Sequence, residues 1–289
     1  MKLHQTILLL SILTILSCKK DDPIAITQPQ LILKFKFDDT QQRLDNLGQP
    51  AVIPNGHAAQ TPVFHLMGAH YVELSKANDI PAYNGTQLFK SPTTTAGGSE
   101  AIDFDEALYA KDNEAFFRMN IADINPGTFK YLRMSLSYQN FDINFRVQGQ
   151  NLTGRLASFV GANSYIRDFQ INNETIAVND NKLQGYWAFE TDFPGVDVLE
   201  GQAPEGATTV PNPLAATSAI PPGSCLVTGV FETPFELTGT ETEDVIITIS
   251  ISTNNSFEWM DTNGNGIYEP ADGEVVVDMG VRGLIPMVE

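Results

Sequence analysis

The amino-acid sequence predicts an all-β protein, an antiparallel β-sandwich with long loops and at most one or two short helices. Apolar residues recur at every second position in many short stretches, which is the spacing of a strand with one buried face. Gly, Pro, Asn and Asp separate these stretches, as they do between strands. Helical spacing with a capping residue occurs only at residues 103–110. The chain is 42% hydrophobic and has 17 Phe, which is enough to bury a core.

The first predicted strand begins at Leu31. Apolar and other residues alternate from Leu33 onward, so Leu31, Leu33, Phe35 and Phe37 share one face. The same alternation predicts further strands at residues 116–121, 131–138, 144–147, 152–159, 186–189, 226–237 and 245–251. Two stretches with Pro, Gly and few consecutive apolar residues predict long loops, at 76–98 and 192–223. No linker divides residues 30–289, so a single domain is expected.

The N-terminus has the pattern of a secretory signal. Lys2 precedes an apolar run, residues 7–16, that is too short to span a bilayer. Leu16-Ser17-Cys18 resembles the lipobox of bacterial lipoproteins, which implies removal of residues 1–17 and lipidation of Cys18. An ordinary signal peptide is the alternative.

Residues 18–29 are the predicted lipidated tether. They begin Cys-Lys-Lys-Asp-Asp, which is similar to a surface-export signature of some Gram-negative lipoproteins, although a plain charged tether would have the same composition. We therefore expect an outer-membrane lipoprotein of the cell envelope, exposed at the surface. Its contact with the membrane is expected through the N-terminal lipid only.

The charge balance excludes one class of partner. The chain has 17 Lys and Arg against 35 Asp and Glu, a formal net charge of −18, so nucleic acid is not an expected partner. A dispersed acidic surface attracts cations, which makes calcium worth considering. With Cys18 lipidated, Cys225 is the one remaining thiol, so no intramolecular disulfide is expected. The apolar neighbours of Cys225 predict a buried strand cysteine.

Residues 261–272 match a calcium loop of twelve residues, with oxygen-bearing side chains and a glycine at the required spacing. The predicted ligands are Asp261, Asn263, Asn265, the carbonyl of Ile267, Glu269 and Asp272. Asp272 is shorter than the usual Glu, so Glu274 is a possible substitute. Pro270 and the strand-like residues after it deny the loop the exit helix of the helix–loop–helix family. A structural calcium ion is the prediction, and a polar Asn-Gly hairpin without an ion is the alternative.

The histidines after the signal fall in one short stretch, at His57, His65 and His70. Imidazole suits copper and zinc, and Met67 or Glu73 could complete a site. Because His65 and His70 are five apart, they face opposite sides of a regular strand, and only a bulge, expected at Gly68, would bring them together. The alternatives are a copper or zinc site and separate core or surface histidines.

A family resemblance rests on the order of three segments. An opening Leu-x-Phe-x-Phe strand is followed by the histidine-bearing strand. Residues 120–133, Asn-Ile-Ala-Asp-Ile-Asn-Pro-Gly-Thr-Phe-Lys-Tyr-Leu-Arg, then lead into a long strand. Over residues 30–140 this order resembles the MbnP-like family. The resemblance implies a periplasmic or surface β-sandwich and, since some members bind copper, a copper or zinc carrier that uses residues 57–70.

Catalysis is not indicated by any motif. Gly-x-Ser-x-Gly, His-Glu-x-x-His and a phosphate-binding loop are absent, and no histidine follows His70. Asp103, Asp105 and Glu106 could be imagined as a two-carboxylate hydrolase pair, but a solvated acidic turn is the simpler interpretation.

A second possible ligand site lies in residues 184–190. Tyr186 and Trp187 are candidates for stacking on sugar rings, although alternation places them on opposite faces of a strand. The function expected from the sequence is therefore binding or assembly without catalysis, with a glycan or an envelope protein as partner. The copper or zinc carrier is the main rival.

Overall fold

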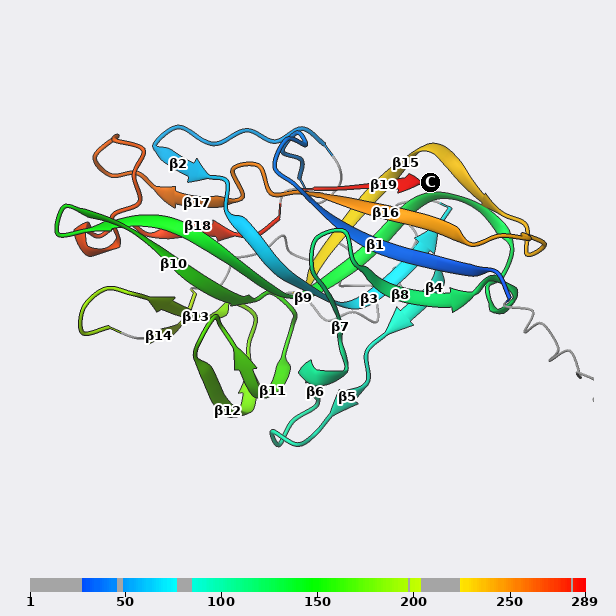
Figure 1. The fold of residues 1–289 in the computed structure, drawn as a ribbon, viewed down its shortest axis with the longest axis horizontal. Coiled ribbons are helices and arrows are strands. Elements are labelled where there is room, and N and C mark those ends of the chain that lie inside the picture. Colours follow the sequence, from blue (N-terminus) through cyan, green and yellow to red (C-terminus); the bar gives the residue numbers. More distant parts are fainter. Residues whose placement is uncertain (1–27, 46–48, 77–84, 197, 204–223, 282) are drawn as a thin grey trace, which may run out of the picture.

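The computed structural model describes residues 28–45, 49–76, 85–196, 198–203, 224–281 and 283–289, and it confirms the all-β class. Strands dominate these ranges. The helical turns within them are 3₁₀ turns of three residues each, Phe104–Glu106 (η2), Ile121–Asp123 (η3) and Pro270–Asp272 (η4). The molecule is elongated (Figure 1), and its buried apolar side chains form one large and one smaller cluster.

A 21-residue strand, β9 (Gly127–Val147), is the axis of the largest sheet. The order in this sheet is β14 (Val198–Gln202), β13 (Tyr186–Thr191), β10 (Gln150–Phe159), β9, β3 (Val63–Ser75) and β4 (Thr86–Lys90). The first half of β9 also pairs with β15 (Cys225–Leu237), and β3 pairs with β7 (Leu108–Ala110). The sequence predicted two strands, 131–138 and 144–147, where the structure has one.

A second sheet supplies the opposite side of the core. Its order is β19 (Leu284–Val288), β16 (Val245–Ser252), β1 (Gln30–Asp38) and β8 (Ala115–Asn120). The predicted inner face of β1 is confirmed for Leu31, Leu33 and Phe35, which are fully buried. The β1–β16 pair is parallel, unlike most pairs in the fold, and sets Phe35 beside Ile249.

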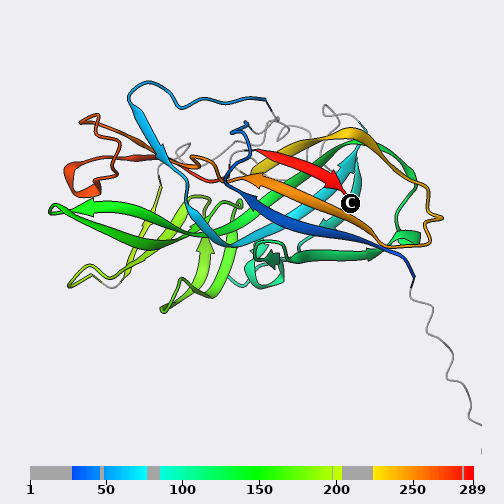
Figure 2. The ribbon, with the colours of Figure 1, turned by 45° about the horizontal axis from the view of Figure 1, so that its top comes forward.

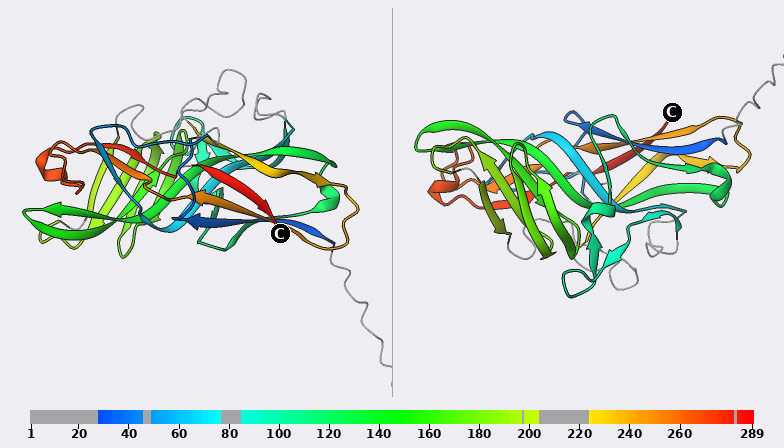
Figure 3. Two further views of the ribbon diagram at one scale, coloured as in Figure 1. Left: turned by 90° about the horizontal axis from the view of Figure 1, so that it is seen from above. Right: turned by 60° about the horizontal axis from the view of Figure 1, so that its bottom comes forward.

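Two smaller sheets flank this sandwich. One has the order β12 (Thr175–Lys182), β11 (Ser164–Gln170), β6 (Ala101–Asp103) and β5 (Thr93–Thr94). The other joins β18 (Val276–Met279), β17 (Phe257–Met260) and β2 (His57–Gln60). The first of these sheets shares a small apolar cluster with β9 and β10, and the second contributes Phe257, Trp259 and Met279 to the main core. Figure 2 and Figure 3 show the arrangement of the strands from further directions.

Residues 103–110, where the sequence has helical spacing, contain only the single 3₁₀ turn η2. Asp103 caps the turn by accepting the Asp105 N–H, but Ala107 is extended and β7 follows. The reason is tertiary, since Leu108 and Tyr109 complete pairs with β3. The predicted loops contain short strands: β4 and β5 lie in 76–98, and β14 lies in 192–223. Residues 77–84, 197 and 204–223 of those loops lie outside the described ranges.

The two ends of the molecule differ. The start of β1 lies at one end, whereas the loop after β17 and the β9–β10 hairpin lie at the other (Figure 1). A hydrogen bond from the Arg146 N–H to the Tyr268 carbonyl oxygen, 2.8 Å long, joins the hairpin to the loop. The candidate calcium loop is therefore far from the point where the N-terminal tether would leave the fold.

Candidate functional site

Asp261 organises the backbone of the candidate calcium loop. Its Oδ1 accepts the N–H groups of Gly264 at 2.8 Å and Asn265 at 3.2 Å, and its Oδ2 accepts that of Gly266 at 2.9 Å. Gly264 and Gly266 have φ of +72° and +69°, a conformation that favours glycine. The glycine expected at the bend of the loop is thus required by its backbone.

The amide side chains of the loop converge on one carboxylate. Asn263 Nδ2 and Asn265 Nδ2 both donate to Glu269 Oε2, at 2.8 and 2.7 Å. These two hydrogen bonds are the main reason that the pKa of Glu269 lies below its usual range, and Arg146, 3.6 Å away, acts in the same direction. Four of the predicted ligands, Asp261, Asn263, Asn265 and Glu269, therefore lie in one connected network.

The remaining predicted ligands, Ile267 and Asp272, differ in their surroundings. Ile267 lies in the loop, and its N–H donates to Asn265 Oδ1 at 2.7 Å. Asp272 is exposed in η4, and its backbone N–H bonds the Glu269 carbonyl. Glu274 is buried instead, and its carboxylate accepts the N–H groups of Thr262 at 3.3 Å and Glu269 at 2.7 Å. Glu274, the substitute considered from the sequence, is the carboxylate that closes the loop.

The three histidines have separate partners. His57 Nδ1 lies 2.5 Å from Glu258 Oε1, His65 Nε2 lies 2.8 Å from Asp142 Oδ2, and His70 Nε2 lies 2.6 Å from Ser135 Oγ. In the ranges that the structure describes, no three side chains of His, Cys, Asp or Glu are grouped as a metal site would need.

Bulges do interrupt the histidine strand, and they fall on both sides of Gly68. The pairing of β3 with β9 shifts around His65 and around His70 as well as just after Gly68. A side chain at position 68 would collide with the Tyr109 ring, because its Cβ would stand 2.5 Å from the nearest ring carbon, so glycine permits the close approach of β7. Met67 is fully buried in the core, away from solvent.

Tyr186 and Trp187 point to opposite faces of β13, as alternation predicts. Tyr186 is buried in a small aromatic cluster, and its hydroxyl donates to the Glu200 carboxylate. Trp187 is partly exposed and packs against the main core. Its ring lies over Gly201 of β14, where any side chain would meet the indole at 2.5 Å. The two aromatic residues therefore do not form one stacking platform.

Trp187 instead lines an open apolar cavity of about 580 Å³. One wall comes from β9, β10, β13 and β14, and the other comes from β17, β18 and the end of the candidate calcium loop. The lining side chains are largely apolar: Ile143, Phe145, Val147, Leu156, Trp187, Phe189, Phe193, Val196, Leu199, Ala203, Phe257, Tyr268, Pro270, Ala271, Val275, Val276 and Met279, with Thr191, Gln202 and Glu274 as the polar members. Sequence reasoning missed this cavity, because its walls come from segments far apart in the chain.

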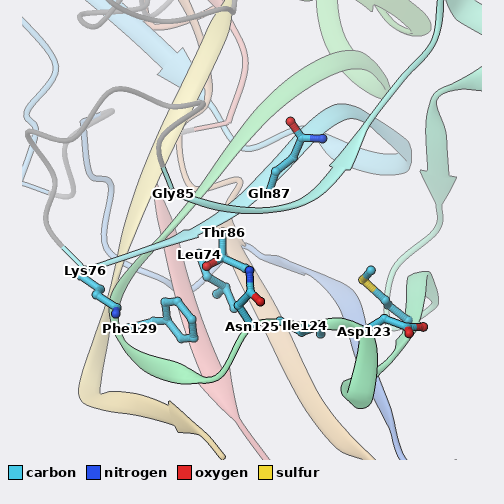
Figure 4. A pocket seen from close by; sticks show the side chains of 10 residues that line it. Leu74, Lys76, Gly85, Thr86, Gln87, Asp123, Ile124, Asn125 and Phe129 are labelled. Atoms are coloured by element: carbon cyan, nitrogen blue, oxygen red, sulfur yellow. The ribbon is translucent and has the colours of Figure 1, made fainter. Parts of the chain in front are cut away.

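A second, more polar pocket of about 410 Å³ lies beside β4 and β9. Figure 4 shows Lys76 and Phe129 on one side of it and Asp123 on the other. Its walls include Lys76 and Gly85, and the residues that join these two in sequence lie outside the described ranges. Asp123 is the one carboxylate among the described residues of its lining.

Two of the acidic residues considered as a hydrolase pair stabilise local structure instead. Asp103 caps η2, and Asp105 forms an exposed ion pair with Arg167. Cys225 is buried in β15, as expected. Cys18 and the predicted signal lie outside the described residues, and within those residues no helix has the length and apolar character needed to cross a membrane.

Comparisons with known protein families, with curated proteins and with solved structures find no match to this chain.

Proposed function

We propose that this chain is a lipid-anchored protein of the cell envelope that acts by binding rather than by catalysis, with a structural calcium ion in the loop at 261–272. The lipobox-like sequence at Cys18 supports the anchor. The observation that carries the calcium site is the convergence of Asn263 and Asn265 on Glu269, beside the Asp261 carboxylate that holds the loop backbone.

Oxygen atoms from carboxylates, amides and backbone carbonyls are the ligands that calcium prefers. The loop offers all three kinds, and Glu274 adds a buried carboxylate next to it. A Ca²⁺ ion would bring positive charge to a segment that carries Asp261, Glu269 and Glu274 and in which Arg146 lies 3.6 Å from Glu269. The ion would therefore stiffen the segment that joins β17 to β18.

The experiment uses the chain from residue 19 to 289, which contains every described element. Bound metals are measured by mass spectrometry, and melting is followed with and without a chelator. We expect one equivalent of calcium. At a calcium concentration tenfold above Kd, the ion adds about 1.4 kcal/mol of stability, which corresponds to a rise in Tm of roughly 3–6 °C.

Asp261→Ala is the test variant, and Asp39→Ala, at an exposed aspartate outside the loop, is the control. The first should lose the calcium and the chelator effect, and the second should keep both. Calcium retained by Asp261→Ala would contradict the site. One equivalent of copper or zinc in the wild type would instead support the histidine segment.

A further inference from the structure

The apolar cavity beside the candidate calcium loop has the size of a small-molecule site. Its volume of about 580 Å³ lies within the range of roughly 300–1,000 Å³ that is typical of ligand pockets. At about 30 Å³ for each water-sized group, it would hold a ligand with on the order of 20 non-hydrogen atoms. A folded partner or a second sheet would not fit inside it.

The walls of the cavity are formed by specific packing of aromatic rings against glycines. The ring of Trp187 lies over Gly201, and that of Phe189 lies over Gly154, where a Cβ would meet it at 2.2 Å. These glycines let two aromatic rings lie against neighbouring strands and form a smooth wall. Phe189 also stacks edge-to-face on Phe145, with 5.3 Å between ring centres.

The lack of cationic side chains in the lining favours uncharged apolar ligands over charged ones. Among the described residues that line the cavity there is no Lys, Arg or His, and Glu274 is the charged member. Its carboxylate already accepts two backbone N–H groups. The chain as a whole has a net charge of −18, so a carboxylate or phosphate in the cavity would lose its hydration without gaining a cation.

We propose that this cavity binds an uncharged apolar small molecule. The inference names the ligand class for the binding role proposed above, on which it rests, but it does not require the calcium ion. Leu199 and Val275, 48% and 55% exposed, line the cavity at its rim, where the ligand would cover them. Thr191 and Gln202 are the neutral polar residues of the lining, beside which a ligand with one hydroxyl or ether group could lie.

The test uses the chain from residue 19 to 289 and the neutral fluorophore N-phenyl-naphthylamine. Its fluorescence should rise in a saturable way, with one probe bound per chain. Dodecanol should displace it, and laurate, which has a chain of the same length with a carboxylate, should compete at least roughly tenfold more weakly because of the buried charge.

Leu199→Asp is the site variant, and Leu183→Asp is the matched control, because Leu183 is 66% exposed and does not line the cavity. We expect Leu199→Asp to weaken probe binding by roughly tenfold, since it places a charge against the ligand. Leu183→Asp should change the affinity less than about twofold. Both positions are on the surface, so melting should show that both variants fold.

The proposal is overturned if the wild type shows no saturable binding, if laurate competes as well as dodecanol, or if the two variants lose affinity equally. It is also overturned if both the probe and the Leu199→Asp substitution dissociate a dimer of the chain, because the cavity would then be an interface between two copies. Size-exclusion chromatography would detect this dissociation. Calcium is measured in the same samples. Probe binding without calcium would contradict the calcium loop alone, and calcium without probe binding would contradict this inference alone.

Discussion

At the scale of single residues, His70 is the histidine whose protonation bears most on stability. It is buried in β3 against Ser135, and burial lowers its pKa from 6.5 to about 3. The folded protein therefore keeps His70 neutral at a pH where the unfolded chain protonates it. The stability from this group is complete above pH 6.5 and is lost as the pH falls from 6.5 toward 3.

We expect wild type, relative to His70→Gln, to lose about 2 kcal/mol of unfolding free energy between about pH 7 and pH 5. Burial raises the pKa of Glu73 to about 7, which acts in the opposite direction over the same range, but Glu73 is present in both proteins and cancels in the difference. Urea unfolding at the two pH values measures the effect. Equal pH dependence of wild type and His70→Gln would contradict the prediction.

At the scale of elements, glycine positions decide how closely strands pass. A Cβ at Gly229 in β15 would lie 2.1 Å from Leu284 Cδ2 and 2.8 Å from the Leu284 carbonyl oxygen of β19. We expect Gly229→Ala to push β19 from β15 and to lower the free energy of unfolding by about 1–3 kcal/mol.

Gly280→Ala is the control for this substitution, because Gly280 is also buried but its nearest neighbour is the flexible Gln139 side chain, at 3.5 Å. It should change stability by less than about 1 kcal/mol. Denaturation in urea reports both values. Similar losses in the two variants would show that the close approach of β15 and β19 is not what makes Gly229 necessary.

The strands that the sequence predicted are those with one buried face. Alternation was enough for β1, β10 and β16. Alternation failed in the middle of β9, where the polar residues Gln139 and Asn140 look like a turn but are buried. Asn140 Nδ2 donates a hydrogen bond to the carbonyl oxygen of Ile171. This contact joins two segments that are distant in sequence, so no local pattern contains it. Alternation also missed β12, in which half of the residues are exposed and none is buried.

The candidate site likewise has features that the sequence reveals and features that it does not reveal. The candidate calcium loop is a continuous segment, so its spacing is visible in the sequence, and the binding of calcium by Glu274 in place of Asp272 stays a prediction. The histidine segment was visible too, but pairing with β9 and β17 gives each histidine its own partner. The cavity was not predictable, because it depends on how β13 and β18, far apart in the chain, face each other.

At the scale of the whole molecule, the loop and the cavity share a wall. Tyr268, Pro270 and Glu274 belong to the candidate calcium segment or adjoin it, and all three line the cavity. They follow β17 in sequence, and the segment between β17 and β18 lies at the end of the molecule opposite to the start of β1 (Figure 1). If the two proposals hold, an ion that fixes this segment also fixes one side of the ligand site.

The consequence is a reciprocal coupling between calcium and the apolar ligand. We expect saturating calcium to tighten N-phenyl-naphthylamine binding by about fivefold or more, because the wall is ordered before the ligand arrives. Thermodynamic linkage then requires saturating ligand to tighten calcium binding by the same factor.

Fluorescence titration with and without calcium measures the effect of calcium on the fluorophore, and calorimetric titration of calcium with and without dodecanol measures the effect of the ligand on calcium. Asp261→Ala should keep the weaker, calcium-free affinity for the fluorophore and lose the coupling. Equal affinities in calcium and in chelator would show that the wall formed by Tyr268 and Pro270 is already rigid, and that the ion stabilises the fold without tuning the cavity.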